Sequence, residues 1–222
     1  MHKEQEKIFW QIIGSLDELN LLYHVMIIGS WAEYLYSFYF QSDFHHNLLT
    51  RDLDLFFINI NKPNQKIDLI GSFSKFGLIY QEDPFNGVGK FYKENLIEVE
   101  FLTRSMGSGF DNHTIKSIGI KSESLRSINI FLRYPCEVKC NGFCLKTPDP
   151  SAYILQKLMI NKDRFGGKKE KDIRSIKELA QHIIKNKEEF NKLQKIFFSL
   201  PKKSQEIIRN TTKSNFIELN LA

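Results

Sequence analysis

Apolar residues recur along the first part of the chain with two different periods. Between residues 4 and 22 they recur every three or four positions, which predicts an amphipathic helix because residues at that spacing share one helix face. The short apolar run Tyr23–Ile28 predicts a buried strand, and Asp52–Ile58 predicts another. A second helix is predicted over Trp31–Phe40, between these two strands. A helix over residues 65–76 and a strand over Leu96–Leu102 continue this mixed pattern.

The character of the chain changes at Thr147–Pro150, a run of turn-forming and helix-capping residues. Before it lies a strand-rich stretch that ends at Lys146 and contains Asn141-Gly142, a typical two-residue hairpin turn. After it the apolar spacing is helical, with predicted helices over Ser151–Arg164, Lys169–Asn186, Lys187–Phe198 and Ser204–Arg209. We therefore predict an α+β fold, with a mixed β-sheet and flanking helices over residues 1–146 and a C-terminal helical bundle over residues 147–222.

Composition indicates a soluble globular protein. The chain has 222 residues, of which 42% are hydrophobic and 26% charged. No apolar run approaches the ~20 residues that cross a bilayer, and the N-terminus lacks a signal peptide. We expect a cytoplasmic protein with no membrane partner.

Three cysteines, Cys136, Cys140 and Cys144, follow one another at regular spacing. The spacing raises the alternative of a zinc site. The intervening hairpin turn, however, puts Cys136 and Cys140 on one face and Cys144 on the other. Reduced structural thiols in a cytosolic protein are the favoured interpretation.

Charge is divided unevenly between the two parts of the chain. Lys157–Lys213 carries 16 Lys and Arg against 7 Asp and Glu, whereas the rest carries 15 against 19. A basic helical half is suited to phosphate-rich ligands such as RNA, although a solvated helical surface has the same composition.

The strongest chemical signal is Asp52-Leu53-Asp54 on a predicted strand. Because side chains alternate faces along a strand, the two aspartates share one face about 6–7 Å apart, and Leu53 points to the core. Paired carboxylates repel each other unless a cation compensates, and carboxylate oxygens suit Mg²⁺ or Mn²⁺. This pair is the predicted metal site.

Gly29-Ser30 and a second acidic strand extend the predicted site. A small turn between a strand and a helix lets backbone N–H groups face an anion, although many such turns have no ligand. Glu98 and Glu100 share one face of the strand Leu96–Leu102, so either one could be a third metal ligand. We favour Glu100, which lies between apolar residues.

The helical half contributes Lys157, the only charge on an otherwise apolar segment, with Arg164 on the same ridge of the helix. At about 100° per residue, Asp172 falls inside the apolar stripe of the next helix. An inward-facing aspartate needs a partner, and Lys157 is the obvious one. A structural ion pair and a shared role toward nucleotide phosphates both remain open.

Together these segments resemble the DNA-polymerase-beta-like nucleotidyltransferase superfamily. The resemblance rests on IIGSWAEYLYS, TRDLDLFF and IEVEFLT, in which glutamate replaces the more usual third aspartate. The helical motifs TPDPSAYILQKLMINKDR and KKEKDI resemble the AbiEii/MenT-like branch of minimal bacterial nucleotidyltransferases.

The resemblance implies a catalytic core that moves a nucleoside monophosphate from an NTP to an acceptor hydroxyl. Mg²⁺ or Mn²⁺ would be bound by Asp52, Asp54 and Glu100. The nucleotide would be bound by Gly29, Ser30, Lys157 and Arg164, and Asp172 would orient Lys157 or the acceptor.

The acceptor and the biological partner stay open. In the MenT-like branch the acceptor is the 3′ end of tRNA, which would make this chain a toxin with a cognate antitoxin. The alternatives are a small-molecule, antibiotic-type transferase, a catalytically inactive nucleotide-binding module, and a glycosyltransferase with the same Asp-x-Asp pattern. The Gly- and Ser-rich residues 103–114 are a candidate lid, and His45-His46 is more typical of a solvated loop than of a ligand pair.

Overall fold

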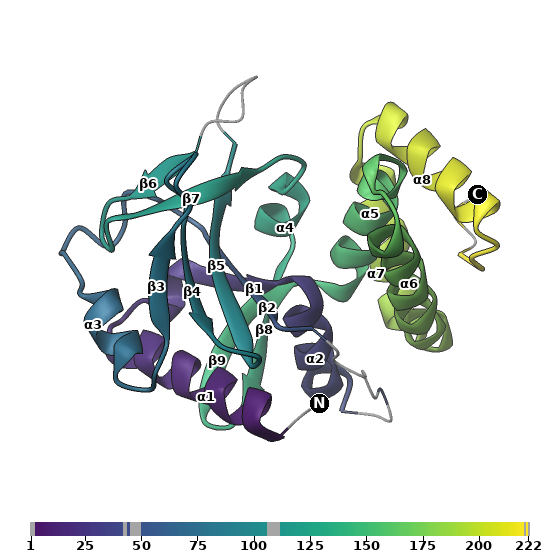
Figure 1. The fold of residues 1–222 in the computed structure, drawn as a ribbon. Helices are drawn as coiled ribbons and strands as arrows, with labels where there is room; N and C mark the ends of the chain where they lie inside the picture. Colours follow the sequence, from purple (N-terminus) through teal and green to yellow (C-terminus); the bar gives the residue numbers. More distant parts are fainter. Residues whose placement is uncertain (1–2, 42–43, 45–49, 106–111, 220, 222) are drawn as a thin grey trace. The chain divides into compact units, whose positions relative to one another are not determined.

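The computed structural model describes residues 3–41, 44, 50–105, 112–219 and 221 (Figure 1). The chain divides into two compact units: Met1–Arg126 with Pro135–Thr147, and Ser127–Tyr134 with Pro148–Ala222. His45-His46 and half of the candidate lid, residues 106–111, lie outside the described residues. Within the described chain, no helix combines the length and the apolar character that crossing a membrane requires.

A mixed sheet forms the centre of the first unit, with β1, β2, β5, β4 and β3 as neighbours in that order (Figure 1). β2 runs parallel to β5, whereas β1 is antiparallel to β2 and β4 is antiparallel to β5. β7 extends the sheet from β5 and pairs with β6. The strands are β1 (Val25–Ile28), β2 (Asp52–Phe57), β3 (Ile79–Glu82), β4 (Gly89–Lys93), β5 (Ile97–Arg104), β6 (His113–Ile115) and β7 (Ile120–Leu125). This mixed sheet confirms the predicted α+β class.

Helices and a separate hairpin complete the first unit. They are α1 (Lys3–Glu18), the short 3₁₀ helix η1 (Leu22–His24), α2 (Gly29–Phe40), α3 (Leu69–Ser74), and the hairpin of β8 (Pro135–Cys140) with β9 (Phe143–Pro148). α1 ends four residues before the predicted limit, because Asn20 adopts a positive φ of 55° that a helix cannot continue. Cys140 is buried and Cys144 exposed on the hairpin, and both are free thiols.

Aromatic side chains join these helices and the hairpin into one core. Phe9 of α1 stacks on Trp31 of α2 with ring centroids 4.3 Å apart. The next residue, Trp10, stacks on Phe143 of β9 at 6.1 Å. The abundant phenylalanines thus connect α1 to two elements that are distant in sequence.

The second unit consists of helices, as predicted for the C-terminal part of the chain (Figure 1). They are α4 (Asn129–Arg133), α5 (Pro150–Ile160), η2 (Asn161–Asp163), α6 (Gly167–Lys185), α7 (Lys187–Ser199) and α8 (Lys202–Ser214). α5 contacts α6, α7 and α8, which explains why it is apolar nearly all round. Asp149 caps α5 by accepting a hydrogen bond of 2.9 Å from the backbone N–H of Ser151.

The short helix α4 differs from the prediction, which described the stretch that ends at Lys146 as strand-rich and placed no helix in it. Residues Ser127–Tyr134 group with the helical unit although they precede the hairpin in sequence. Phe131 of α4 stacks on Tyr153 of α5 with centroids 6.1 Å apart. This packing between distant residues stabilises a five-residue helix that local propensity would not form alone.

Replacing Phe9 by alanine tests the aromatic core. Phe9 is fully buried, so Phe9→Ala is expected to lower the free energy of unfolding by about 3–5 kcal/mol. Urea denaturation followed by circular dichroism measures this change. Phe85→Ala is the control, because Phe85 is 96% exposed and its loss should cost less than about 0.5 kcal/mol. Equal losses in the two variants would contradict the packing described.

Candidate active site

One face of the sheet carries two adjacent rows of side chains, polar except for Ile79, that cross four strands. The strand registers give a first row of Asp54, Glu100, Lys90 and Gln81, and a second row of Asp52, Glu98, Tyr92 and Ile79. Residues paired across strands point to the same face, so each row is continuous. The other face is apolar, since the residues between the acids are almost completely buried: Leu53, Leu55, Val99 and Phe101. The predicted acidic positions therefore lie together on neighbouring strands.

Gly29 lies directly beside Asp54. Ile28 pairs with Asp54 across β1 and β2, and α2 begins at the next residue, Gly29. The φ of Gly29 is +66°, which favours glycine, and a Cβ atom there would overlap Oδ2 of Asp54. The Gly-Ser turn and the second aspartate of the motif are thus in contact, with the N-terminus of a twelve-residue helix beside them.

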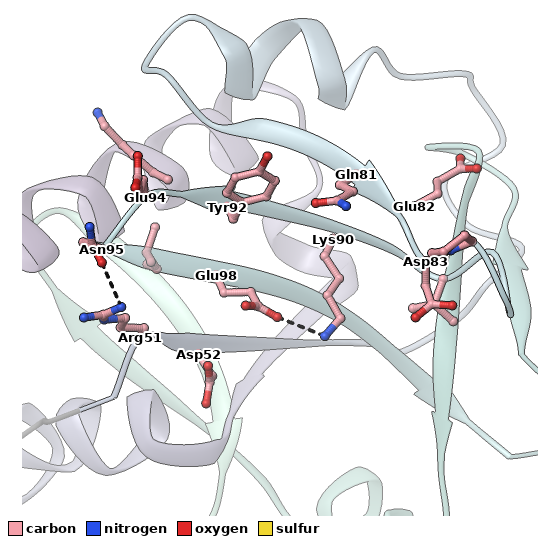
Figure 2. Close-up of a pocket in the computed structure, with 14 residues that line it drawn as sticks. Arg51, Asp52, Gln81, Glu82, Asp83, Lys90, Tyr92, Glu94, Asn95 and Glu98 are labelled. Carbon is pink, nitrogen blue, oxygen red and sulfur yellow. Dashed lines mark hydrogen bonds and ion pairs between the residues drawn. The ribbon is translucent and has the colours of Figure 1, made fainter.

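Lys90 is a site residue that the sequence analysis did not identify. Its Nζ lies 2.9 Å from Oε1 of Glu98 and 2.5 Å from Oε1 of Glu100, so it bridges the two glutamates of β5 (Figure 2 shows the bond to Glu98). The sequence does contain a signal for Lys90. The turn after Lys93 joins β4 to β5, and counting back from this turn along β4 places Lys90 opposite Glu100.

The three bridged groups are electrostatically unequal. The hydrogen bond from Lys90 lowers the pKa of Glu98. Burial raises the pKa of Glu100 in spite of Lys90, since Glu100 is the more deeply placed of the two. Burial alone would lower the pKa of Lys90, but its hydrogen bonds to Glu100 and Glu98 outweigh that effect and raise it. Lys90 stays protonated, and Glu100 is the harder of the two glutamates to ionise.

The donor set on this face suits a hard divalent cation, because Asp52, Asp54 and Glu100 offer only carboxylate oxygens. Among the residues that the structure describes, no three His, Cys, Asp or Glu side chains are gathered around a common point. Lys90 engages both glutamates, and Glu100 is the less exposed of the two, with a side-chain exposure of 21% against 40% for Glu98. Ligation by all three carboxylates therefore requires Glu100 to change partner.

The helical unit contains the second predicted cluster. Nζ of Lys157 lies 2.6 Å from Oδ1 of Asp172, and Nε of Arg164 lies 3.5 Å from Oδ2 of the same carboxylate. The Lys157 ammonium also lies 5.0 Å from the ring centroid of Tyr153. The predicted pairing of Lys157 with Asp172 is thus formed, and Arg164 joins it from the partly exposed end of η2.

A cavity of about 510 Å³ opens on the polar face of the sheet. Its lining includes Asp52 and Glu98 from the second polar row, Lys90 from the first, and residues of the β3–β4 and β4–β5 turns (Figure 2). Its volume falls in the range of small-molecule sites.

A match to a family model shows which protein family the chain belongs to. A family model described as "Nucleotidyltransferase" matches residues 8–195.

The chain belongs to this nucleotidyltransferase family.

Its relatives among solved structures are distant in sequence. An antigenic nucleotidyltransferase-like protein from Paracoccidioides brasiliensis is 15% identical, with 93% of this chain and 87% of that chain covered and a TM-score of 0.53. The antibiotic-resistance factor ANT(2'')-Ia is 14% identical, with 97% and 95% covered and a TM-score of 0.48, which supports no further argument. The first likeness concerns the fold alone. A comparison with curated protein sequences finds no significant match.

Family membership makes this chain a nucleotidyltransferase enzyme and sets aside the glycosyltransferase alternative. The match includes the Gly-Ser turn, the Asp-Leu-Asp strand and the Lys157–Asp172 pair, since all of them lie between residues 8 and 195. The resemblance to the AbiEii/MenT-like branch stays a prediction.

Substituting Gly29 tests its contact with Asp54. Gly29→Ala is expected to lower the rate of nucleotidyl transfer about 100-fold, because the new Cβ displaces the carboxylate. Gly119→Ala is the matched control: its φ is +70°, but nothing lies within 4 Å of an added Cβ. Both variants should lose about 1–2 kcal/mol of stability from backbone strain. If activity falls equally in both variants, the contact has no catalytic consequence.

The Lys157–Asp172 pair gives a separate prediction for the helical unit. Asp172→Asn removes the charge of the carboxylate that pairs with the buried Lys157 ammonium, so the free energy of unfolding should fall by about 3–5 kcal/mol. The exposed Asp163 on η2 is the control, and Asp163→Asn should change stability by less than about 0.5 kcal/mol. The double variant Lys157→Met/Asp172→Leu should recover most of the loss in urea denaturation, and no recovery would show that the cost is not due to breaking this ion pair.

Proposed function

We propose that this nucleotidyltransferase transfers a nucleoside monophosphate from an NTP to an acceptor hydroxyl and releases pyrophosphate in a metal-dependent reaction. The observation that supports it best is the arrangement of Asp52, Asp54 and Glu100 on one sheet face, with Asp54 in contact with Gly29. Mg²⁺ or Mn²⁺ bound by these carboxylates would neutralise charge on the phosphates and activate the acceptor hydroxyl.

The residues of the chain bind and position the reactants. The backbone N–H groups at the start of α2, with the Ser30 hydroxyl, are suited to hold the phosphates. Lys157 and Arg164 supply further positive charge, and the 2.6 Å contact with Asp172 fixes the orientation of the Lys157 ammonium. That the two cations reach the triphosphate is inferred from the family resemblance, because they belong to the other compact unit.

Two acceptor classes are candidates for this reaction. An RNA acceptor such as the 3′ end of tRNA is favoured by the excess of Lys and Arg in Lys157–Lys213, and would fit a cytoplasmic toxin with a cognate antitoxin. A small-molecule acceptor is favoured by the cavity of about 510 Å³ beside Asp52.

The variant Asp52→Asn/Asp54→Asn tests the reaction. Wild-type protein with Mg²⁺, each α-labelled NTP and a mixture of tRNA and small metabolites should transfer label, and the double variant should be slower by about 1000-fold. Removing two adjacent like charges should not lower its stability, so the loss would not reflect unfolding. Asp17→Asn/Glu18→Gln removes the same charge from exposed positions of α1 and should keep full activity. Transfer that survives in the double variant, or that resists EDTA, would refute the assigned roles.

A further inference from the structure

The cavity lies on one particular side of the catalytic carboxylates. The strand order β1-β2-β5-β4-β3 puts Gly29 and Ser30 beside β2 on one side and the β3–β4 hairpin two strands beyond β2 on the other. Each strand step is about 4.8 Å, so the carboxylates of β2 and β5 separate the Gly-Ser turn from the cavity. Figure 2 shows Glu94 and Asn95 at one end of the cavity, Asp83 at the other, and Tyr92 and Gln81 between them.

In-line displacement assigns different reactants to the two sides. The attacking and leaving oxygens lie roughly opposite each other on the α-phosphorus. When the β- and γ-phosphates lie at the Gly-Ser turn, the leaving pyrophosphate is on the β1 side. The attacking hydroxyl must then approach from the β5–β4–β3 side, where the cavity opens next to Asp52 and Glu98.

The charged side chains that line this cavity indicate which acceptors it would attract. Five carboxylates line it against three cations, which leaves an excess of two negative charges. Lys90 bridges the glutamates of β5, Lys93 donates a 2.8 Å hydrogen bond to the carbonyl of Phe76, and Arg51 donates to Asn95.

Three of the five carboxylates belong to the two turns. Glu82 and Asp83 belong to the β3–β4 side and Glu94 to the β4–β5 turn, and no ion pair to any of them is found in the described part of the chain. Glu82 accepts a hydrogen bond from the Tyr80 hydroxyl, and Asp83 accepts from the backbone of its own turn, so both carboxylates are held in place.

We propose that this cavity is the acceptor pocket and that it takes a small hydroxyl-bearing molecule with protonated amines. The inference rests on the proposed nucleotidyl transfer and names its acceptor class. In the reaction the acceptor oxygen bonds to the α-phosphorus as the bond from that phosphorus to the pyrophosphate oxygen breaks, and the hydroxyl proton passes to solvent. Carboxylates at both ends hold the amines, and Tyr92 and Gln81 offer a polar floor for further hydroxyls. An RNA chain, with a phosphate at every residue, would be repelled at the same surface.

The test uses two disaccharides that differ only in charge. The β-1,4-linked glucosamine disaccharide carries two protonated amines, and its N,N′-diacetyl form has the same ring hydroxyls without the charge. Titration calorimetry at saturating Mg²⁺ measures the binding of each to the full chain, and an α-labelled NTP then reports transfer to each sugar and to total tRNA. We expect the amine form to bind at least about tenfold more tightly and to take the label.

A charge-neutral pocket variant identifies the surface. Glu82→Gln/Glu94→Gln should weaken binding of the amine form about tenfold and leave NTP binding unchanged. Glu4→Gln/Glu18→Gln removes the same charge from exposed positions of α1 outside the cavity lining, and should bind as the wild type does.

Each other outcome overturns the proposal. Equal binding of the two sugars, no binding of either, or full binding by the pocket variant would show that the cavity does not select a cationic acceptor. Label on tRNA that is unaffected in the pocket variant would assign the acceptor to RNA and to another surface. These failures differ from failure of the proposed function, in which the Asp52→Asn/Asp54→Asn variant would bind and transfer nucleotide as the wild type does.

Discussion

Repulsion between like charges on neighbouring strands is the constraint around which the sheet is organised. The parallel register of β2 and β5 sets Asp52 opposite Glu98 and Asp54 opposite Glu100, an arrangement that destabilises a sheet by itself. The apolar side chains on the other face maintain it, because a slip of one residue would bury the carboxylates and expose the core. Lys90 of β4 relieves part of the repulsion from a third strand. The polar site and the hydrophobic core therefore depend on one and the same strand register.

Features governed by local periodicity could be predicted from the sequence. Alternation along β2 and β5 predicted which acids share a face, and the helical angle between positions predicted that Asp172 meets Lys157, now seen at 2.6 Å. Features that depend on pairing between distant segments could not be predicted in the same way. The order of the strands brings Lys90 to Glu100, and the grouping of Ser127–Tyr134 with the later helices produces α4. Neither leaves a periodic signal, because each depends on contacts whose partners are set by the whole fold.

The overall charge of the chain conceals two opposite environments. A formal net charge of +5 suggests a moderately basic protein, yet the excess of Lys and Arg is confined to the helical half. The turns beside Asp52 and Glu98 are acidic, and the cations among them donate hydrogen bonds to neighbouring groups. A transferase that brings together a polyanionic nucleotide and a cationic acceptor would need such a separation, since one uniform surface could attract only one of them.

Two structural constraints restrict position 29 to glycine. At that position backbone conformation and the space beside Asp54 both exclude a side chain, so two independent requirements act on a single codon. A homologue with a larger residue there would have to move its second aspartate away from the start of the helix. Under the proposed function, the residue at position 29 would distinguish homologues that keep the metal site from those that have lost it, even where both aspartates persist in the sequence.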